Sequence, residues 1–175
     1  MKKQADAPKI RSTADLFAVA YQIEADAVDR YTMLADQMDS HNNPELAAVF
    51  RDLARAEGIH AEEIRRLAGK LDVKGRADKV AKWKKTESPE AVELGAAHYL
   101  MTRREALQLA LAGEQRALAY FQQVAESVAD PGIKELAKKF AEEEAEHVEL
   151  CHRLLKKYPA SETAPFDPDP GISQG

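Results

Sequence analysis

The sequence predicts an all-α protein, a four-helix bundle built from two helix pairs that a long, partly helical crossover connects. Four segments carry apolar residues every three or four positions, which is the period of a helix with one buried face. Each segment is bounded by capping residues, prolines or a turn. The two halves of the chain also repeat each other. At 175 residues, with 45% hydrophobic and 31% charged residues, the composition suits one soluble domain with a sizeable core.

The first helix pair is expected over residues 13–69. Its first helix begins at Ser12 or Thr13, since either hydroxyl can cap it, and runs to about Ser40. The turn at residues 41–44 offers an asparagine N-cap and a proline suited to the first helical position, and the second helix extends to about Gly69. The apolar residues expected to face inward are Leu16, Ala20, Ile23, Ala27, Tyr31, Leu34, Phe50, Leu53, Ala54, Ile64 and Leu67.

The second helix pair is expected over residues 103–158, after a less regular crossover at 71–101 in which Ser88-Pro89 predicts a short helix. Residues 102–105 have the spacing of a capping box and start the third helix. Asp130-Pro131 ends it and starts the fourth. The apolar residues expected to face inward are Leu107, Leu111, Leu118, Phe121, Val124, Ile133, Leu136, Phe140, Val148, Cys151 and Leu154.

The chain ends and the overall charge limit the classes of partner. Residues 1–12 are polar and predict a flexible N-terminus without a signal peptide, and the proline-rich residues 159–175 predict a disordered or docked tail. A net charge of −5 argues against nucleic acid. No apolar run approaches the roughly 20 residues that span a bilayer. The single Cys151 fits a reducing compartment, so a cytoplasmic protein is expected.

The internal repeat brings the most distinctive polar residues into register. A shift of 90 residues relates the first helix to the third, and a shift of 87 relates the second to the fourth. A bundle of this kind would have a pseudo-two-fold axis. The residues that correspond are Glu24 with Glu114, Tyr31 with Phe121, Glu57 with Glu144, and His60 with His147.

Six of these residues predict a site for two metal ions. Each Glu-x-x-His word places a carboxylate and an imidazole on one helix face, in phase with the apolar stripe. Burying four unpaired carboxylates costs several kcal/mol each, and no lysine or arginine is expected on these stripes near them. Two divalent ions would neutralise their charge of about −4. The predicted ligands, which would also be catalytic through the metals, are Glu24, Glu57, His60, Glu114, Glu144 and His147.

The chain resembles the rubrerythrin branch of the ferritin-like superfamily over residues 13–158. The resemblance implies a ferritin-like bundle with two carboxylate-bridged iron ions that cycle between Fe²⁺ and Fe³⁺, although the ligand types also suit manganese. It further implies that Glu57 and Glu144 bridge the metals, that Glu24 and Glu114 are terminal ligands, and that each histidine supplies one nitrogen. The segments that carry it are Ile23-Glu24-Ala25 through Tyr31, Glu57-Gly58-Ile59-His60-Ala61-Glu62, Gly113-Glu114 and Glu143-Glu144-Ala145-Glu146-His147.

Two departures from the family pattern affect the expected chemistry. Rubrerythrins typically carry a further glutamate where this chain has Ala117, so His60 is expected to be a fixed ligand. The family also commonly has a rubredoxin domain with four cysteines, whereas Cys151 is alone and is expected to pack in the core. Electrons must then come from an external donor, such as a rubredoxin-type protein or a flavin reductase.

These features lead to three alternative functions. The first is a non-haem diiron peroxidase or oxidase, active in oxidative stress, that reduces hydrogen peroxide or dioxygen with external electrons. An apolar wall of Leu53, Phe121 and Phe140 would favour such a small oxidant. The second is a ferroxidase that handles iron, which Ala117 supports, and the third is a manganese catalase. A homodimer is expected, and the long crossover permits exchange of helix pairs.

A few other residues have two interpretations. Tyr31 is either a core residue with a bonded hydroxyl or a redox-active neighbour of a ligand. Glu143 competes with Glu144 as the partner of His147, and the repeat favours Glu144. The remaining residues, expected to be structural or exposed, are His41, His98, His152 and a basic cluster of Lys79, Lys82, Lys84 and Lys85 around Trp83, which could also dock an acidic electron carrier.

Overall fold

Four long helices make up most of the part of the chain that the structure describes. The computed structural model describes residues 10–77 and 101–160. Within these ranges there is no strand, and a short helical segment occupies residues 73–77. The all-α fold class is therefore confirmed. The bounds of the long helices are Thr13–Ser40 for α1, Pro44–Ala68 for α2, Arg103–Ser127 for α5 and Pro131–Leu155 for α6.

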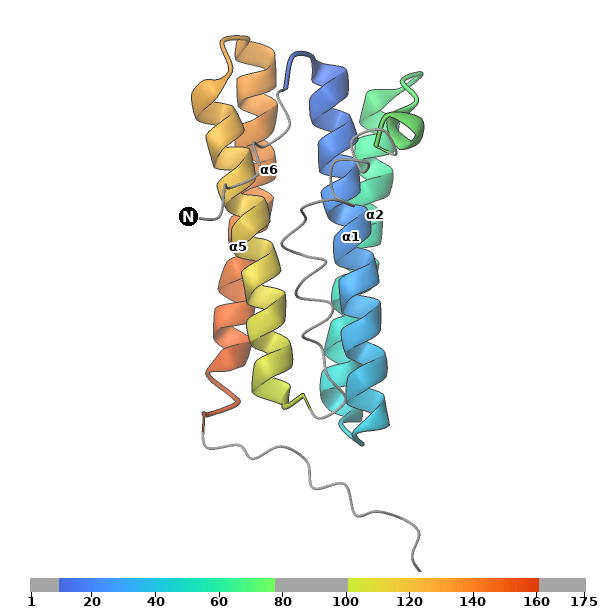
Figure 1. Ribbon diagram of the computed structural model, residues 1–175, viewed down its shortest axis with the longest axis vertical. Helices are drawn as coiled ribbons and strands as arrows, with labels where there is room; N and C mark the ends of the chain where they lie inside the picture. Colours follow the sequence, from blue (N-terminus) through green and yellow to red (C-terminus); the bar gives the residue numbers. More distant parts are fainter. Residues whose placement is uncertain (1–9, 78–100, 161–175) are drawn as a thin grey trace, which may run out of the picture.

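The helices are arranged as two hairpins that lie side by side (Figure 1). α1 packs along α2, and α5 packs along α6, while contacts between the hairpins include those of α1 with both α5 and α6. The short connections at residues 41–43 and 128–130 make each pair antiparallel. This arrangement brings one face of each helix to a common interior.

The helix ends follow from local capping. The Ser12 hydroxyl accepts a hydrogen bond from the Asp15 backbone N–H at 3.1 Å. Thr102 and Glu105 form the predicted capping box, in which each side chain accepts a hydrogen bond from the other residue's backbone N–H, at 3.1 and 2.7 Å. Asn43 occupies the N-cap position of α2, but its side chain makes no capping hydrogen bond. Side chains within the first turn thus cap α1 and α5, whereas α2 begins at Pro44 without a side-chain cap.

The interior consists of two apolar clusters separated by a polar layer. The first cluster includes Tyr31, Phe50 and Cys151 and lies near the turn between α1 and α2. The second includes Phe121 and Phe140 and lies near the turn between α5 and α6. Each of the four helices has residues of one cluster on one side of its buried glutamate and residues of the other cluster on the other side. The apolar clusters therefore enclose the polar layer from both ends.

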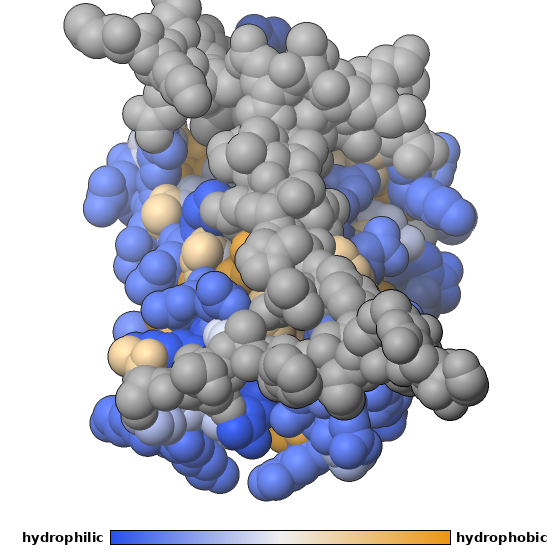
Figure 2. Space-filling view, turned by 60° about the horizontal axis from the view of Figure 1, so that its bottom comes forward, coloured by the Kyte–Doolittle hydropathy of each residue, from blue (hydrophilic) through white to orange (hydrophobic). Residues whose placement is uncertain are grey.

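The exterior is predominantly polar. Figure 2 shows hydrophilic residues over most of the described surface in that view, with small, separate hydrophobic patches. None of the helices in the described ranges is long and apolar enough to cross a membrane.

One predicted core residue was placed wrongly. Leu67 is 47% exposed, whereas Ile64 and Ala68 are buried. At about 100° per residue, Leu67 lies about 80° from Glu57 around α2, and Ala68 only about 20°. The alanine therefore takes the inward position. The predicted short helix at Ser88-Pro89, His98, the basic cluster around Trp83 and most of both tails lie outside the described residues.

Candidate metal centre

The six predicted ligands lie together in the polar layer. α1 supplies Glu24, α2 supplies Glu57 and His60, α5 supplies Glu114, and α6 supplies the remaining two. All four glutamates are at most 3% exposed. The glutamates lie in the interior because their spacing puts them on the same face of each helix as the apolar residues, and that face is buried. All six side chains come from one chain in this structure.

Each imidazole lies close to a carboxylate of at least one other helix. His147 Nδ1 lies 3.1 Å from Glu57 Oε1 and 3.4 Å from Glu114 Oε2. His60 Nδ1 lies 3.4 Å from Glu57 Oε2 and 4.0 Å from Glu24 Oε2. The two rings stack almost in parallel, with centroids 5.3 Å apart. The histidines therefore lie on one side of the carboxylates, between α2 and α6.

Several atoms at the centre of this cluster lack hydrogen-bond partners. Both carboxylate oxygens of Glu57 and Nδ1 of both histidines lie close to one another, but none of them has a partner with hydrogen-bond geometry among the described residues. Such orphaned polar atoms are rare in folded proteins and usually indicate an ion or water that satisfies them. Ligand atoms of Glu57, His60 and His147 lie within 4.8 Å of one another, and so do those of Glu114, Glu144 and His147. The donor set therefore fits two metal ions with mixed oxygen and nitrogen ligands.

The electrostatics of the cluster also favour cations. Burial raises the pKa of Glu24 to about 11, and contact with Glu57 and the charge on Glu144 add to this effect. Burial likewise raises the pKa of Glu144 to about 10, with the charge on Glu114 next in importance. Glu24 and Glu144 therefore favour the protonated form at neutral pH, and metal ions would displace these protons on binding.

Glu114 differs from the other glutamates because a cation lies beside it. Arg30 Nη2 is 3.1 Å from Glu114 Oε1, and the arginine is only 8% exposed. Burial acts to raise the pKa of Glu114, but the contact with His147, the charge of Arg30 and the hydroxyl of Tyr31 outweigh it and lower this pKa to about 2. The expected stripes indeed carry no arginine near the glutamates, but Arg30 reaches Glu114 from outside them, so the inference that all four carboxylates are unpaired is wrong.

Sequence reasoning missed Arg30 because this α1 residue reaches Glu114 by packing against Gly113 of α5. Its position on α1 lies away from the stripe that contains Glu24. The available signal was Gly113, which precedes Glu114 on α5 and has no side chain to block an approaching guanidinium. Such an approach depends on a contact between two helices that are far apart in the sequence.

Tyr31 contacts the site directly. Its hydroxyl donates a hydrogen bond to Glu114 Oε1, and its ring packs in the first apolar cluster against Phe50. Burial raises the pKa of Tyr31 well above its usual value, so the hydroxyl keeps its proton. The neighbouring Cys151 is buried, and burial raises its pKa to about 12. Tyr31 is therefore a core residue with a bonded hydroxyl, and the partner of that hydroxyl is a predicted ligand, whereas a redox role stays a prediction.

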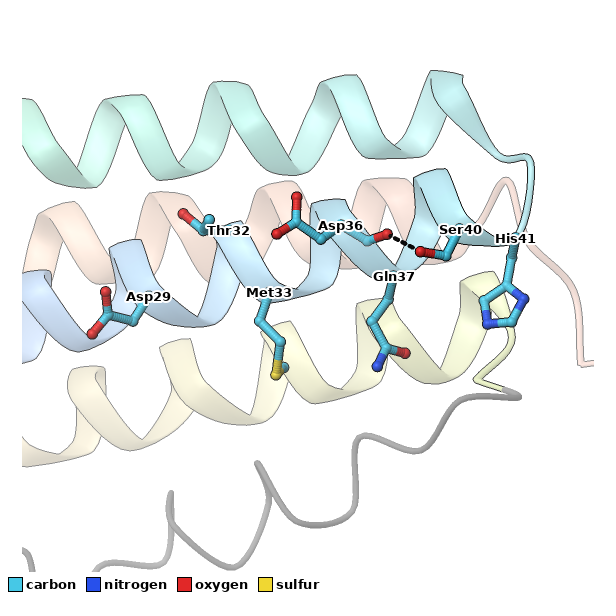
Figure 3. A pocket seen from close by; sticks show the side chains of 7 residues that line it. All are labelled: Asp29, Thr32, Met33, Asp36, Gln37, Ser40 and His41. Atoms are coloured by element: carbon cyan, nitrogen blue, oxygen red, sulfur yellow. Dashed lines mark hydrogen bonds between the residues drawn. The ribbon is translucent and has the colours of Figure 1, made fainter.

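The competing residues lie elsewhere. Glu143 is half-buried and faces Lys139, with its Oε1 3.7 Å from Nζ, whereas Glu144 belongs to the cluster. Neither His41 nor His152 belongs to either group of candidate ligands in the described ranges. An open depression on α1 includes none of the six residues (Figure 3). It is lined by Asp29, Thr32, Met33, Asp36, Gln37, Ser40 and His41.

Comparison with known proteins agrees with this arrangement. The model of the rubrerythrin family matches residues 15–155, with a further match over residues 105–168. The chain is also similar to an uncharacterized conserved protein from Magnetospirillum magnetotacticum MS-1, whose crystal structure has a TM-score of 0.68 at 34% sequence identity. That similarity covers 87% of this chain and 99% of the other. No curated protein matches. The fold is thus a ferritin-like helical bundle, and the chain belongs to the rubrerythrin family.

Proposed function

We propose that the chain is a diiron oxidoreductase that reduces hydrogen peroxide to water, or reduces dioxygen, with electrons from an external donor. The observation that carries this proposal is the buried set of four carboxylates and two imidazoles, whose facing atoms lack hydrogen-bond partners. Membership of the rubrerythrin family supports iron as the resident metal. Manganese suits the same ligand types, and elemental analysis of the purified protein distinguishes the two metals.

The six side chains divide into two sets of ligands. Glu114, Glu144 and His147 would hold one ion. Glu57 and His60, which group with His147 in the structure, would hold the other together with Glu24, whose Oε2 lies 4.0 Å from His60 Nδ1. When bound, two such ions supply two electrons to one bound oxidant. Reduction of one hydrogen peroxide to two waters takes these two electrons and two protons.

The surroundings of the cluster restrict what can react there. Leu53 belongs to the apolar cluster on one side of the polar layer, and Phe121 and Phe140 pack together on the other, with ring centroids 5.3 Å apart. The side chains of His60 and His147 are 25% and 13% exposed, whereas those of the four glutamates are at most 4% exposed. The histidines are therefore the ligands nearest to solvent. A small oxidant can therefore approach from the side of α2 and α6, and the apolar walls exclude bulky substrates.

Rapid mixing of the fully reduced, iron-loaded protein with each oxidant tests the reaction. We expect hydrogen peroxide to oxidise the iron at least about tenfold faster than dioxygen, equivalent to about 1.4 kcal/mol in barrier height. Stopped-flow absorption measures both rates under the same conditions. Ferrous iron mixed with the His60→Ala/His147→Ala variant controls for reaction away from the site. Faster reaction with dioxygen would exclude the peroxidase assignment, and oxygen release from peroxide without a reductant would indicate a catalase instead.

A ferroxidase that oxidises Fe²⁺ for storage or detoxification is the second candidate. It is favoured by Ala117, which is buried on α5 where rubrerythrins typically carry a further glutamate. The remaining six ligands form a minimal, nearly symmetric set. A storage protein needs a large hollow assembly, so light scattering of protein supplied with excess Fe²⁺ and dioxygen discriminates the two functions. A particle no larger than a dimer, without an iron core, favours the oxidoreductase.

A further inference from the structure

The two halves of the metal centre are held differently, although their predicted ligands correspond. One oxygen of Glu114, Oε1, accepts hydrogen bonds from both Arg30 Nη2, at 3.1 Å, and the Tyr31 hydroxyl. Its other oxygen, Oε2, lies 3.4 Å from His147 Nδ1. Two donors therefore fix the orientation of this carboxylate and leave one oxygen directed toward the cluster.

Gly113 provides the space that Arg30 occupies. A Cβ atom added to Gly113 would lie 2.5 Å from Cζ and 2.8 Å from Nε of Arg30. Any other residue at this position would force the guanidinium to move. The arginine also lies over the Tyr31 ring, with Cζ 5.3 Å from the ring centroid. Arg30, Tyr31 and Gly113 thus form one packed unit against Glu114.

The internal repeat shows that the other half lacks this unit. The shift of 90 residues that relates Glu24 to Glu114 relates Arg30 to Tyr120 and Tyr31 to Phe121. Phe121 has no hydroxyl to donate, and the Tyr120 hydroxyl is buried without a hydrogen-bond partner among the described residues. Among the described residues, the basic side chain within 4.0 Å of the Glu24 carboxyl group is that of His60. Glu24 contacts Glu57 and His60 but has no counterpart of the Arg30 and Tyr31 donors among the described residues, so its carboxyl group has more freedom to change position than that of Glu114.

We propose that Arg30, seated over Gly113, is a positioning residue that fixes Glu114 as a one-oxygen ligand and makes the two metal positions unequal. The ion held by Glu114, Glu144 and His147 then exchanges slowly. The ion held by Glu24, Glu57 and His60 exchanges faster, since its terminal carboxylate can swing away. This inference rests on the proposed function, because it requires a site for two ions.

The greater exposure of His60 acts in the same direction. Its side chain is 25% exposed, compared with 13% for His147, so a chelator reaches the Glu24 side more easily. Groups that hydrogen-bond to metal ligands typically change metal affinity or activity by about 10- to 100-fold, so the loss of Arg30 should be measurable.

Release of Co²⁺ from the full-length chain tests the proposal without an activity assay. Protein loaded with Co²⁺ is mixed with excess chelator, and the visible absorption of the bound ion is followed. We expect two phases of equal amplitude in the native chain. Arg30→Met should accelerate the slow phase by about 10- to 100-fold and leave the fast phase unchanged. His60→Ala should retain only the slow phase, which assigns that phase to the His147 side.

Two glycine substitutions provide a matched pair. Gly113→Ala should reproduce the effect of Arg30→Met, because the added methyl group displaces the guanidinium. Gly58→Ala is the control: Gly58 also adjoins a predicted glutamate ligand, but an added Cβ would lie 3.9 Å from Val28 Cγ2, an ordinary contact. The Arg30→Met/Gly113→Ala double variant should release the ion no faster than either single variant, as expected for residues that act together.

The outcomes separate this inference from the proposed function. Two results would overturn the positioning role. One is a single phase of release in the native chain. The other is a slow phase that stays unchanged or becomes slower in Arg30→Met and Gly113→Ala, with circular dichroism showing native helix content in both variants. A slower phase would mean that Arg30 acts by repelling the ions. If the native chain binds no Co²⁺ at all, the two-metal site itself fails.

Discussion

Replacing both His60 and His147 with alanine is expected to lower the bound transition metal from about two ions per chain to nearly none. Each histidine would supply the one nitrogen ligand at its metal position, and His147 Nδ1 lies within 3.4 Å of carboxylate oxygens on both α2 and α5. Without the imidazoles, only oxygen ligands remain, and these bind Fe²⁺ or Mn²⁺ less selectively over Mg²⁺ and Ca²⁺. Elemental analysis after gel filtration measures the metal content.

The matched control is a double variant of two histidines outside the cluster. His41 lies in the turn after α1, and His152 is exposed near the end of α6. Their replacement by alanine should leave the metal content unchanged. Equal metal content in the His60→Ala/His147→Ala variant and the native chain would show that the metal binds somewhere else.

The metal-free chain should become less stable as pH rises from 6 to 9, whereas the metal-loaded chain should not. Glu24 and Glu144 have folded-state pKa values of about 11 and 10, raised from 4.5 mainly by burial. The folded chain therefore holds two protons that the unfolded chain releases above about pH 4.5. Their stabilising contribution is fully present below that pH and is lost as pH rises toward the folded-state values.

The expected size of this effect is large. Each such carboxyl lowers the free energy of unfolding by about 1.4 kcal/mol per pH unit across this window. For a chain of this length that corresponds to a fall in Tm of about 7 °C per pH unit when both groups act. Glu114 does not oppose this trend. Its pKa is lowered from 4.5 to about 2, so its contribution to the free energy of unfolding changes only below about pH 4.5. Contact with Glu57 raises the pKa of His60, which acts in the same direction as the carboxyls.

Thermal unfolding followed by circular dichroism, with and without chelator, measures this pH dependence. Bound metal displaces the protons and removes the slope. A Glu24→Gln/Glu144→Gln variant has no carboxyl to ionise at these positions, so its metal-free Tm should vary much less over the same range. A metal-free native chain whose Tm stays constant or rises from pH 6 to 9 would contradict the proton occupancy of the cluster.

The helices and the six clustered residues could be predicted because they depend on local sequence. Ser12, Thr102 and Asp130 cap helices within one turn of their own positions. The glutamates and histidines follow the phase of the apolar stripes, and a phase error of a few residues would have moved them to the surface. Leu67 shows the limit of this reasoning, because it lies at the edge of the stripe and Ala68 fills the inward position instead.

The position of Arg30 could not be predicted in the same way. A buried arginine requires a partner and a space, and here the partner is Glu114 and the space is above Gly113, both 83 or more residues away in the sequence. The repeat makes the two halves look alike at the ligands, yet Arg30 and Tyr31 correspond to Tyr120 and Phe121, so the surroundings of the ligands differ. Long-range packing, rather than helical phase, determines this difference.

Anomalous X-ray scattering from crystals of protein purified without added metal tests the two-metal site most directly. Two peaks at the iron absorption edge are expected in the polar layer, about 3.5–4 Å apart, with one near Glu114 and His147 and the other near Glu24 and His60. A layer without a transition-metal peak, in which the four carboxyls bond only to one another, to the histidines or to water, would contradict a metal centre in this protein.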